Sequence, residues 1–224
     1  MLMRPLRLVW NRINRGYPGG REIDRFRGLV DGTDDLRPEA WVGSTVCVSY
    51  NKCEADPELG CSEVYIDKGS KVYLKELIAE EPEAYLGRDY VARYGCNIAI
   101  LVKLLDTRRQ LGLQAHPDRS FAKDFFDSDF GKTECWYVIG IRNDQDEEPY
   151  VLIGFKEGIT RSMFEKLFLA GDITGMEKCC HKVPVSVGDM FFVNAGVPHA
   201  IGPGCFMIEV QEASDVGVGS RLME

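Results

Sequence analysis

Three polar side chains in the middle of the chain have the types and the spacing that suit a metal ion. Gln114 and His116 stand two residues apart in GLQAHPD, and Glu134 opens the apolar run ECWYVIGI. Residues i and i+2 of a β-strand point to the same face, so Gln114 and His116 can reach one object. Glu134 can reach the same object from a neighbouring strand. The alternative is a sheet surface that carries three unrelated polar residues.

A fourth candidate ligand lies far downstream, in the glycine-rich segment NAGVPHAIGPG, where His199 opens an apolar strand. Together with the first three residues it offers two imidazoles, a carboxylate and an amide oxygen. Such a set suits Zn²⁺ with one position open for water or substrate, and it also accepts other divalent metals. A lone histidine on an apolar strand is more often a core residue with its hydrogen bonds satisfied. The pattern alone therefore leaves both interpretations open.

The elements that must position these residues are mostly strands. We expect short strands and turns over 42–67, a buried strand over 97–106, a hairpin of 134–141 with 150–157, and three strands within 183–211. We expect helices over 70–87, with Ser70 as N-cap and Pro82 starting a second helix, over 118–128 and over 160–171. Closely spaced strands with a few helices outside predict a mainly β fold, a jelly-roll barrel, rather than a doubly wound sheet.

The composition excludes some classes of function. The 224 residues carry a net charge of −8, which disfavours binding to nucleic acid through bulk charge. The first residues lack a long apolar segment, and no stretch approaches the 18 or so apolar residues of a membrane span. We therefore expect a soluble, cytoplasmic protein with no nucleic-acid or membrane partner.

Eight cysteines are present, without a CxxC pair or a secretory signal. Cys53 with Cys61, and the adjacent Cys179 and Cys180, lie in loop-like surroundings and can bind metal or form a redox pair. A reduced protein is the better interpretation of this cysteine pattern.

The candidate ligands also lie in motifs that resemble those of a known family. The motifs are ILVKLLD with Lys103, QAHPD at 114–118, GKTECWY at 131–137, and AGVPHAIGPG with EVQEASD between 195 and 215. Their joint occurrence at this spacing resembles the type I mannose-6-phosphate isomerases (phosphomannose isomerases), which are zinc-dependent cupins. Weaker similarity reaches upstream to Trp10, Gly19-Gly20 and PEAWVGS. The resemblance implies one cupin-like catalytic domain over 1–224, with helical insertions around 70–90, 118–128 and 160–171.

The resemblance implies a role for each matching residue. The zinc ligands would be Gln114, His116, Glu134 and His199, with one Zn²⁺ per chain. The substrate would meet Lys132 at the mouth of the site, Lys103 near its phosphate, and the position of Gly112. Catalytic roles would fall to Lys132, to the pocket carboxylates Glu209 and Asp215, and to Arg221.

The implied reaction is the interconversion of mannose 6-phosphate and fructose 6-phosphate through a cis-enediol, as part of carbohydrate metabolism. Moving a proton between two adjacent carbons requires a base of near-neutral pKa. It also requires an electrophile for the negative charge that develops on the sugar oxygens, which a bound Zn²⁺ provides. The expected partner is therefore a small phosphosugar.

The chain departs from the family pattern at three places, and these keep two alternatives open. Gly112 replaces a serine that holds phosphate in the family, although its own N–H or the nearby Arg108 and Arg109 can compensate. Arg221 falls two residues after Gly219, the position that matches an active-site arginine, and the family's further C-terminal β domain has no counterpart. The alternatives are a sugar isomerase or epimerase with another substrate, and a non-catalytic, sugar-sensing metal-binding cupin.

Overall fold

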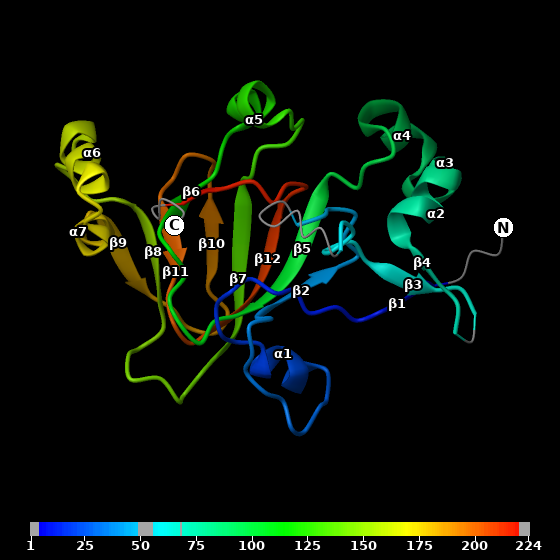
Figure 1. Cartoon of the computed structure of the whole chain (residues 1–224), viewed down its shortest axis with the longest axis horizontal. Coiled ribbons are helices and arrows are strands. Elements are labelled where there is room, and N and C mark those ends of the chain that lie inside the picture. The colour runs from blue at the N-terminus through cyan, green and yellow to red at the C-terminus, as the bar shows by residue number, and fades with distance from the viewer. Residues whose placement is uncertain (1–4, 49–55, 68, 220–224) are drawn as a thin grey trace.

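Two five-stranded antiparallel sheets form the centre of the computed structural model, which describes residues 5–48, 56–67 and 69–219 (Figure 1). The first sheet has the order β10 (Met190–Val193), β7 (Glu134–Ile141), β12 (Cys205–Glu212), β5 (Ile100–Asp106), β2 (Glu39–Val42). The second has the order β13 (Val218–Gly219), β6 (Gln114–Ala115), β11 (His199–Ile201), β8 (Tyr150–Phe155), β9 (Cys180–Pro184). A third, small sheet has the order β1 (Arg7–Leu8), β3 (Glu63–Tyr65), β4 (Lys71–Tyr73).

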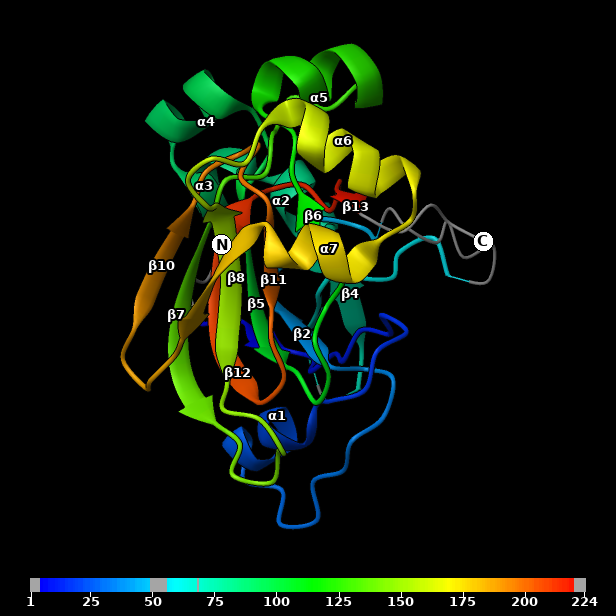
Figure 2. The ribbon, with the colours of Figure 1, turned by 90° about the vertical axis from the view of Figure 1, so that its left-hand side faces the viewer.

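In the described part of the chain, seven short helices surround the sheets: α1 (Arg21–Phe26), α2 (Leu74–Glu80), α3 (Pro82–Leu86), α4 (Arg88–Tyr94), α5 (Arg119–Phe126), α6 (Arg161–Leu169) and α7 (Ile173–Lys178). They include all three predicted helical regions. Figures 1 and 2 show α5 at the top of the molecule and α1 at the bottom, with α6 and α7 beside β8 and β9. Among the described residues, no helix is long and apolar enough to cross a membrane.

The main core lies between the two large sheets. Leu105 and Val138 from the first sheet meet Val151 and Ile201 from the second, and all four are buried. Helices α6 and α7 cover the outer face of the second sheet, while α1 packs on the outer face of the first. Two antiparallel sheets that face each other across one core confirm the predicted mainly β, jelly-roll fold.

At the end of the first sheet nearer α5, charged side chains join the apolar ones that point into the barrel. The register aligns Trp136, Glu209, Lys103 and Trp41 across four neighbouring strands, one row from Leu105 and Val138. Because side chains two apart along a strand share a face, this row points into the barrel. The fold therefore places buried charge at one end of an apolar interior.

The predicted hairpin of 134–141 and 150–157 is wrong, although both segments are strands. β7 pairs with β10 and β12, whereas β8 pairs with β9 and β11. The loop between them crosses from one sheet to the other, and in it the buried Arg142 binds Asp34 and Asp106. Those partners are distant in sequence, so no local pattern reveals the crossing.

The predicted helix start at Ser70 is also wrong. Residues Lys71–Tyr73 form a strand that pairs with Glu63–Tyr65, and α2 begins at Leu74 with Tyr73 as its N-cap. Hairpin pairing of β-branched and aromatic residues with the strand just before them in the chain overrides the helical spacing. The second predicted start is confirmed, because Pro82 is the first residue of α3.

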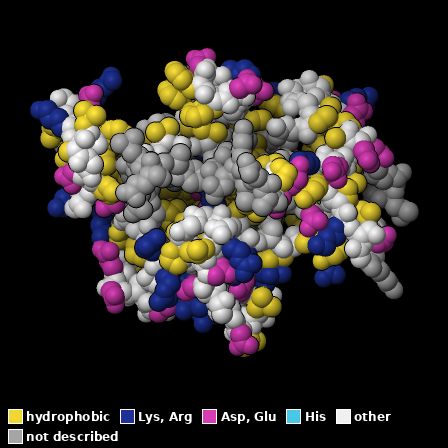
Figure 3. Space-filling model, viewed as in Figure 1, with side chains coloured by type: hydrophobic (Ala, Val, Ile, Leu, Met, Phe, Trp, Pro, Cys, Tyr) yellow, Lys and Arg dark blue, Asp and Glu magenta, His cyan; other side chains and the backbone are white. Residues whose placement is uncertain are grey.

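The surface carries mixed charge and a few apolar patches. Figure 3 shows basic and acidic side chains interspersed around α1, and hydrophobic side chains gathered over α5. The α5 patch consists of Phe121, Phe125 and Phe126, all of which are exposed.

Candidate metal centre

Three of the four predicted ligands converge inside the polar end of the barrel. His116 Nε2 lies 3.4 Å from Glu134 Oε2, and His199 Nε2 lies 3.3 Å from Glu134 Oε1. The ligand atoms of the three residues all lie within 4.8 Å of one another, and each residue is almost completely buried. Their origins differ: Glu134 opens β7 in one sheet, His199 opens β11 in the other, and His116 follows β6.

Local structure explains why the two histidines meet. The backbone N–H of Gly196, which has a φ of +80°, donates to the carbonyl of His116 at 2.7 Å. This bond ties the turn before His199 to the segment that carries His116, and their rings lie 4.8 Å apart. Glycine suits position 196 because a positive φ is costly for other residues. The turn that it forms holds the segments of His116 and His199 next to each other.

Gln114 lies beside this cluster. It pairs directly with His199 in the antiparallel register of β6 and β11. A Cβ added at Gly217 would lie 3.1 Å from the ring of His116 and 3.9 Å from Oε1 of Gln114. Gln114 therefore lies near the ring of His116, and its role as a fourth ligand stays a prediction from the sequence.

The orientation of His199 suits a metal ligand. Its Nδ1–H donates to the carbonyl of Val197 at 2.8 Å, which leaves the lone pair on Nε2. That nitrogen is buried and has no hydrogen-bond partner among the described residues, while Glu134 Oε1 faces it at 3.3 Å. Burial lowers the pKa of His199 to about 4, so the imidazole is neutral at pH 7. A cation fits between two such acceptors, and a backbone bond to the other ring nitrogen is the usual support of a ligating histidine.

The electrostatics of the other two ligands agree with this fit. Burial, followed by the nearby charge of Lys132, lowers the pKa of His116, so its imidazole is neutral at pH 7 as well. Burial and the repulsion of Glu209 raise the pKa of Glu134 to about 7. Two neutral imidazoles and a buried carboxylate whose negative charge nearby cations do not fully balance form a donor set suited to zinc.

Both predicted lysines lie at or near the cluster, but they differ in surroundings. Lys132 Nζ lies 3.0 Å from His116 Nε2 and 3.6 Å from Glu134 Oε2. Lys103 Nζ instead lies among three carboxylates, which are Glu209 at 3.2 Å, Asp215 at 3.8 Å and Glu39 at 3.9 Å. Burial alone would lower the pKa of Lys103, but these three carboxylates raise it, so the ammonium stays charged.

The two predicted catalytic carboxylates are held as anions. Burial would raise the pKa of Glu209, yet the charge of Lys103 lowers it below the ordinary range. The pKa of Asp215 is likewise lowered despite its burial, first by Arg15 and then by Lys103. Arg15 donates two hydrogen bonds to Asp215, at 3.0 and 3.2 Å.

The sequence analysis missed the N-terminal half of this network. Arg15 also lies 3.3 Å from Glu39, which accepts hydrogen bonds from Tyr17 and from the indole of Trp41, both at 2.8 Å. A signal was available in the sequence: R-G-Y and E-A-W each place a charged residue two positions before an aromatic one.

Of the two remaining predicted site residues, the structure describes Gly112 but not Arg221. Gly112 faces open space, since a Cβ added there would meet no atom within 4 Å. A serine at this position would therefore fit. Arg221 lies outside the described residues, as does Cys53, so the structure places neither of them.

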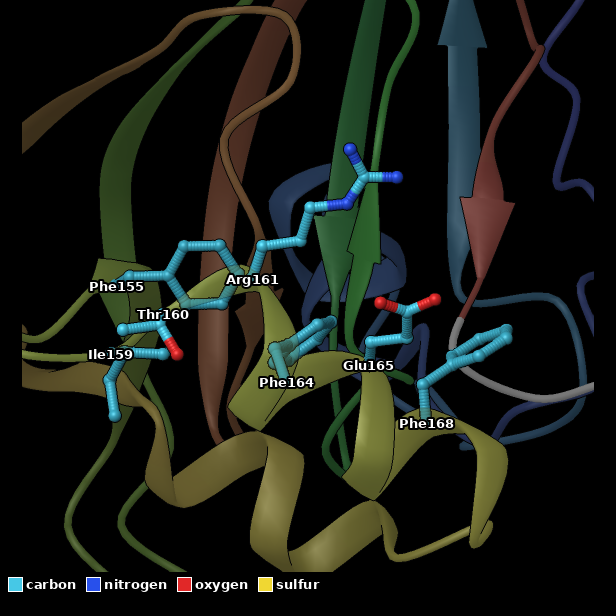
Figure 4. Close-up of a pocket in the computed structure, with 7 residues that line it drawn as sticks. All are labelled: Phe155, Ile159, Thr160, Arg161, Phe164, Glu165 and Phe168. Atoms are coloured by element: carbon cyan, nitrogen blue, oxygen red, sulfur yellow. The ribbon is translucent and has the colours of Figure 1, made fainter.

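A separate apolar pocket of about 410 Å³ lies on the outer side of the molecule, between the end of β8 and α6 (Figure 4). Figure 4 shows Phe164 and Phe168 of α6 on its wall, with Phe155 at the end of β8. It shares no lining residue with the metal cluster and is not part of the candidate site.

Comparison with known proteins agrees with this geometry. Residues 52–139 match the family described as "Phosphomannose isomerase type I, catalytic domain", a range that contains Gln114, His116 and Glu134. The chain is a relative of the type I phosphomannose isomerases. The resemblance predicted from the QAHPD and GKTE motifs is therefore confirmed.

The mannose-6-phosphate isomerase of Streptococcus mutans is 35% identical over 144 residues, which are 64% of this chain and 41% of that protein. The chain spans about a third to two fifths of the length of the curated phosphomannose isomerases that it matches. The crystal structure of the mannose 6-phosphate isomerase from Bacillus subtilis has a TM-score of 0.74 at 24% identity, and covers 96% of this chain and 60% of that one. A zinc-bound mannose 6-phosphate isomerase has a TM-score of 0.69 at 14% identity, over 97% of this chain and 70% of that one. These likenesses show a shared cupin fold.

Proposed function

We propose that the chain is a zinc-dependent aldose–ketose isomerase that interconverts mannose 6-phosphate and fructose 6-phosphate through a cis-enediol. The observation that carries the proposal is the buried cluster of His116, Glu134 and His199, beside Lys132, in a relative of phosphomannose isomerases. The names of the curated relatives support the substrate, and the zinc-bound structural neighbour supports the metal. We further propose that 1–224 acts as one catalytic domain in the cytoplasm.

In this proposal Gln114, His116, Glu134 and His199 hold the zinc. When bound, the metal supplies positive charge that stabilises the negative charge developing on the sugar oxygens. The protein contributes the orientation of the ligands, through the bond from His199 to Val197, and the exclusion of water, through their burial.

The nearby side chains have separate tasks. Lys132 borders the cluster, where its ammonium can donate hydrogen bonds to a sugar oxygen. Glu209 is ionised at neutral pH and its pKa responds to Lys132 and His199, so we assign it a contact with a sugar hydroxyl as an acceptor in the pocket. Because three carboxylates surround Lys103, we assign it the task of keeping Glu209 and Asp215 ionised, in addition to any contact with the phosphate.

A coupled assay on the purified chain tests the proposal, with mannose 6-phosphate and unphosphorylated mannose as substrates. We expect zinc-dependent turnover of the phosphosugar alone. Replacing His116 or His199 by alanine should abolish both metal binding and turnover, whereas His181→Ala, at the exposed third histidine on β9, should leave both unchanged. Turnover of free sugar only would favour an isomerase or epimerase with another substrate, and zinc binding without turnover would favour a sugar-sensing cupin.

A further inference from the structure

Two cysteines that the metal centre does not use lie in direct contact. The Sγ atoms of Cys47 and Cys61 are 2.9 Å apart. This separation is short for non-bonded sulfur atoms and approaches the length of a disulfide, which is about 2.05 Å. The sequence had suggested Cys53 as the partner of Cys61, but the described residues place Cys47 there.

A backbone frame holds the two cysteines together. The N–H of Ser62 donates to the carbonyl of Ser44, and the N–H of Val48 donates to the carbonyl of Leu59, both at 2.8 Å. These bonds bracket the two cysteines, so the segments that carry them run side by side in opposite directions. The backbone pairing therefore holds the two cysteines on neighbouring segments, within reach of each other.

The same geometry argues against a metal at this place. Glu58 Oε2 lies 3.7 Å from Cys47 Sγ, so two sulfurs and a carboxylate are within reach of one ion. Two thiolates that each bind a tetrahedral zinc at about 2.3 Å would lie roughly 3.8 Å apart. The observed sulfur separation is too small for that arrangement, and Glu58 already forms an ion pair with Lys75.

We propose that Cys47 and Cys61 form a reversible thiol–disulfide pair whose oxidant is a low-molecular-weight disulfide such as oxidised glutathione. Cys47 is half-buried and Cys61 is buried, so the Cys47 thiolate attacks the external disulfide and releases one glutathione. The Cys61 thiolate then attacks Sγ of Cys47 and releases the second glutathione. Each departing thiolate takes up one of the two thiol protons, so two protein thiols and one oxidised glutathione give one protein disulfide and two glutathione thiols.

The position of the pair links it to the polar network without making it part of the metal centre. Gly60, next to Cys61, packs so closely on the Trp41 ring that a Cβ there would lie 2.6 Å from it. Trp41 in turn donates its indole N–H to Glu39. Oxidation would therefore fix the segment that covers Trp41. The inference does not depend on the proposed isomerase activity.

Peptide mapping of the full chain after treatment with oxidised glutathione tests the pairing. We expect a peptide that joins Cys47 to Cys61 and that dithiothreitol separates again. The matched control is Cys96→Ser, which removes an exposed cysteine and should leave the joined peptide unchanged. Cys47→Ser and Cys61→Ser should each abolish it, and circular dichroism checks that both variants fold.

Three results would overturn the inference. The first is no joined peptide in the wild type while Cys96 becomes glutathionylated, which shows that the oxidant was active. The second is a peptide that joins Cys53 to Cys47 or to Cys61. The third is protection of Cys47 and Cys61 from the oxidant by equimolar Zn²⁺, which would make the pair a metal site.

Discussion

At the scale of single residues, the proposed chemistry depends on polar atoms that face one another inside the barrel. When Glu134 is ionised, His199 Nε2 and Glu134 Oε1 are both acceptors, because Nδ1 of His199 has donated to Val197. Two acceptors in contact in a buried place are costly unless a cation joins them. A cation bound between them would remove this cost, and both atoms would then be ligands of that cation.

The raised pKa of Glu134 predicts a proton release on metal binding. In the metal-free protein this carboxyl has a pKa of about 7, so at pH 6 it is mostly protonated and must lose its proton to bind zinc. The histidines are neutral at that pH, because their pKa values are lowered. Calorimetry in buffers of different ionisation enthalpy should record about one proton released at pH 6 and close to none at pH 8.5. Equal release at the two pH values would contradict this assignment.

Lys132 should affect turnover and not metal binding. Replacing it by methionine keeps the length of the side chain and removes the donor that lies next to His116. We expect kcat/KM for mannose 6-phosphate to fall about 100-fold or more, since a charged hydrogen bond in a buried site contributes several kcal/mol, with zinc content unchanged. The control is Lys182→Met, at an exposed lysine on β9. Unchanged turnover in Lys132→Met would contradict a role for this lysine with the substrate.

At the scale of elements, the fold is fastened by buried charge as well as by apolar packing. Arg142, in the loop that joins the two sheets, donates to Asp106 at the end of β5 and to Asp34 after α1. Asp106 also accepts the backbone N–H groups of Gly20 and Glu22 at the start of α1. Through Asp106, the guanidinium of Arg142 thus connects α1 to the loop that joins β7 to β8.

Replacing Arg142 by methionine should therefore destabilise the protein strongly. The change leaves Asp106 buried with an uncompensated charge, which costs about 3–5 kcal/mol of unfolding free energy. The matched control is Arg108→Met, because Arg108 is exposed and its pairs with Asp34 and Asp144 should contribute less than about 1 kcal/mol. Urea unfolding measures both, and equal losses in the two variants would contradict the importance of burial.

Helices and strands were predicted well where the sequence pattern favours the same structure as the contacts with distant residues. The buried strand at 97–106 appears as β5, and the helix after Asp118 begins as expected, with the Asp118 side chain accepting from Phe121 N–H. The predicted hairpin of 134–141 with 150–157 failed because strands distant in sequence pair with both segments. The Ser70 cap failed because a local hairpin of β3 with β4 extends to Tyr73. The spacing of Gln114 and His116 suggested a shared face and the family motifs implied the ligand set, whereas the contact of Arg15 with Asp215, 200 positions apart, leaves no such trace.

At the scale of the whole molecule, the metal centre joins the two sheets. Glu134 comes from the first sheet, and His199 and the segment with His116 come from the second. A bound zinc would close the polar end of the barrel, where the apolar core does not reach. The stability of the barrel and the loading of the site should therefore be coupled.

Zinc should raise the melting temperature of the wild-type chain. At a zinc concentration 100 times the dissociation constant, the stabilisation is about 2.7 kcal/mol, which corresponds to a shift of roughly 5–11 °C for a chain of this size. Differential scanning fluorimetry with chelator and with zinc measures the shift, and Glu134→Gln, which keeps the shape but removes the charge, should lose most of it. A zinc-dependent shift of the same size in Glu134→Gln would place the metal elsewhere.

X-ray absorption at the zinc edge of the zinc-loaded chain tests the central claim most directly. The account predicts nitrogen and oxygen neighbours at about 2.0–2.1 Å with two imidazole contributions, falling to one imidazole in His199→Gln. Sulfur neighbours at about 2.3 Å would place the zinc at Cys47 and Cys61 instead. That result, or an imidazole count unchanged in His199→Gln, would contradict a metal centre built from His116, Glu134 and His199.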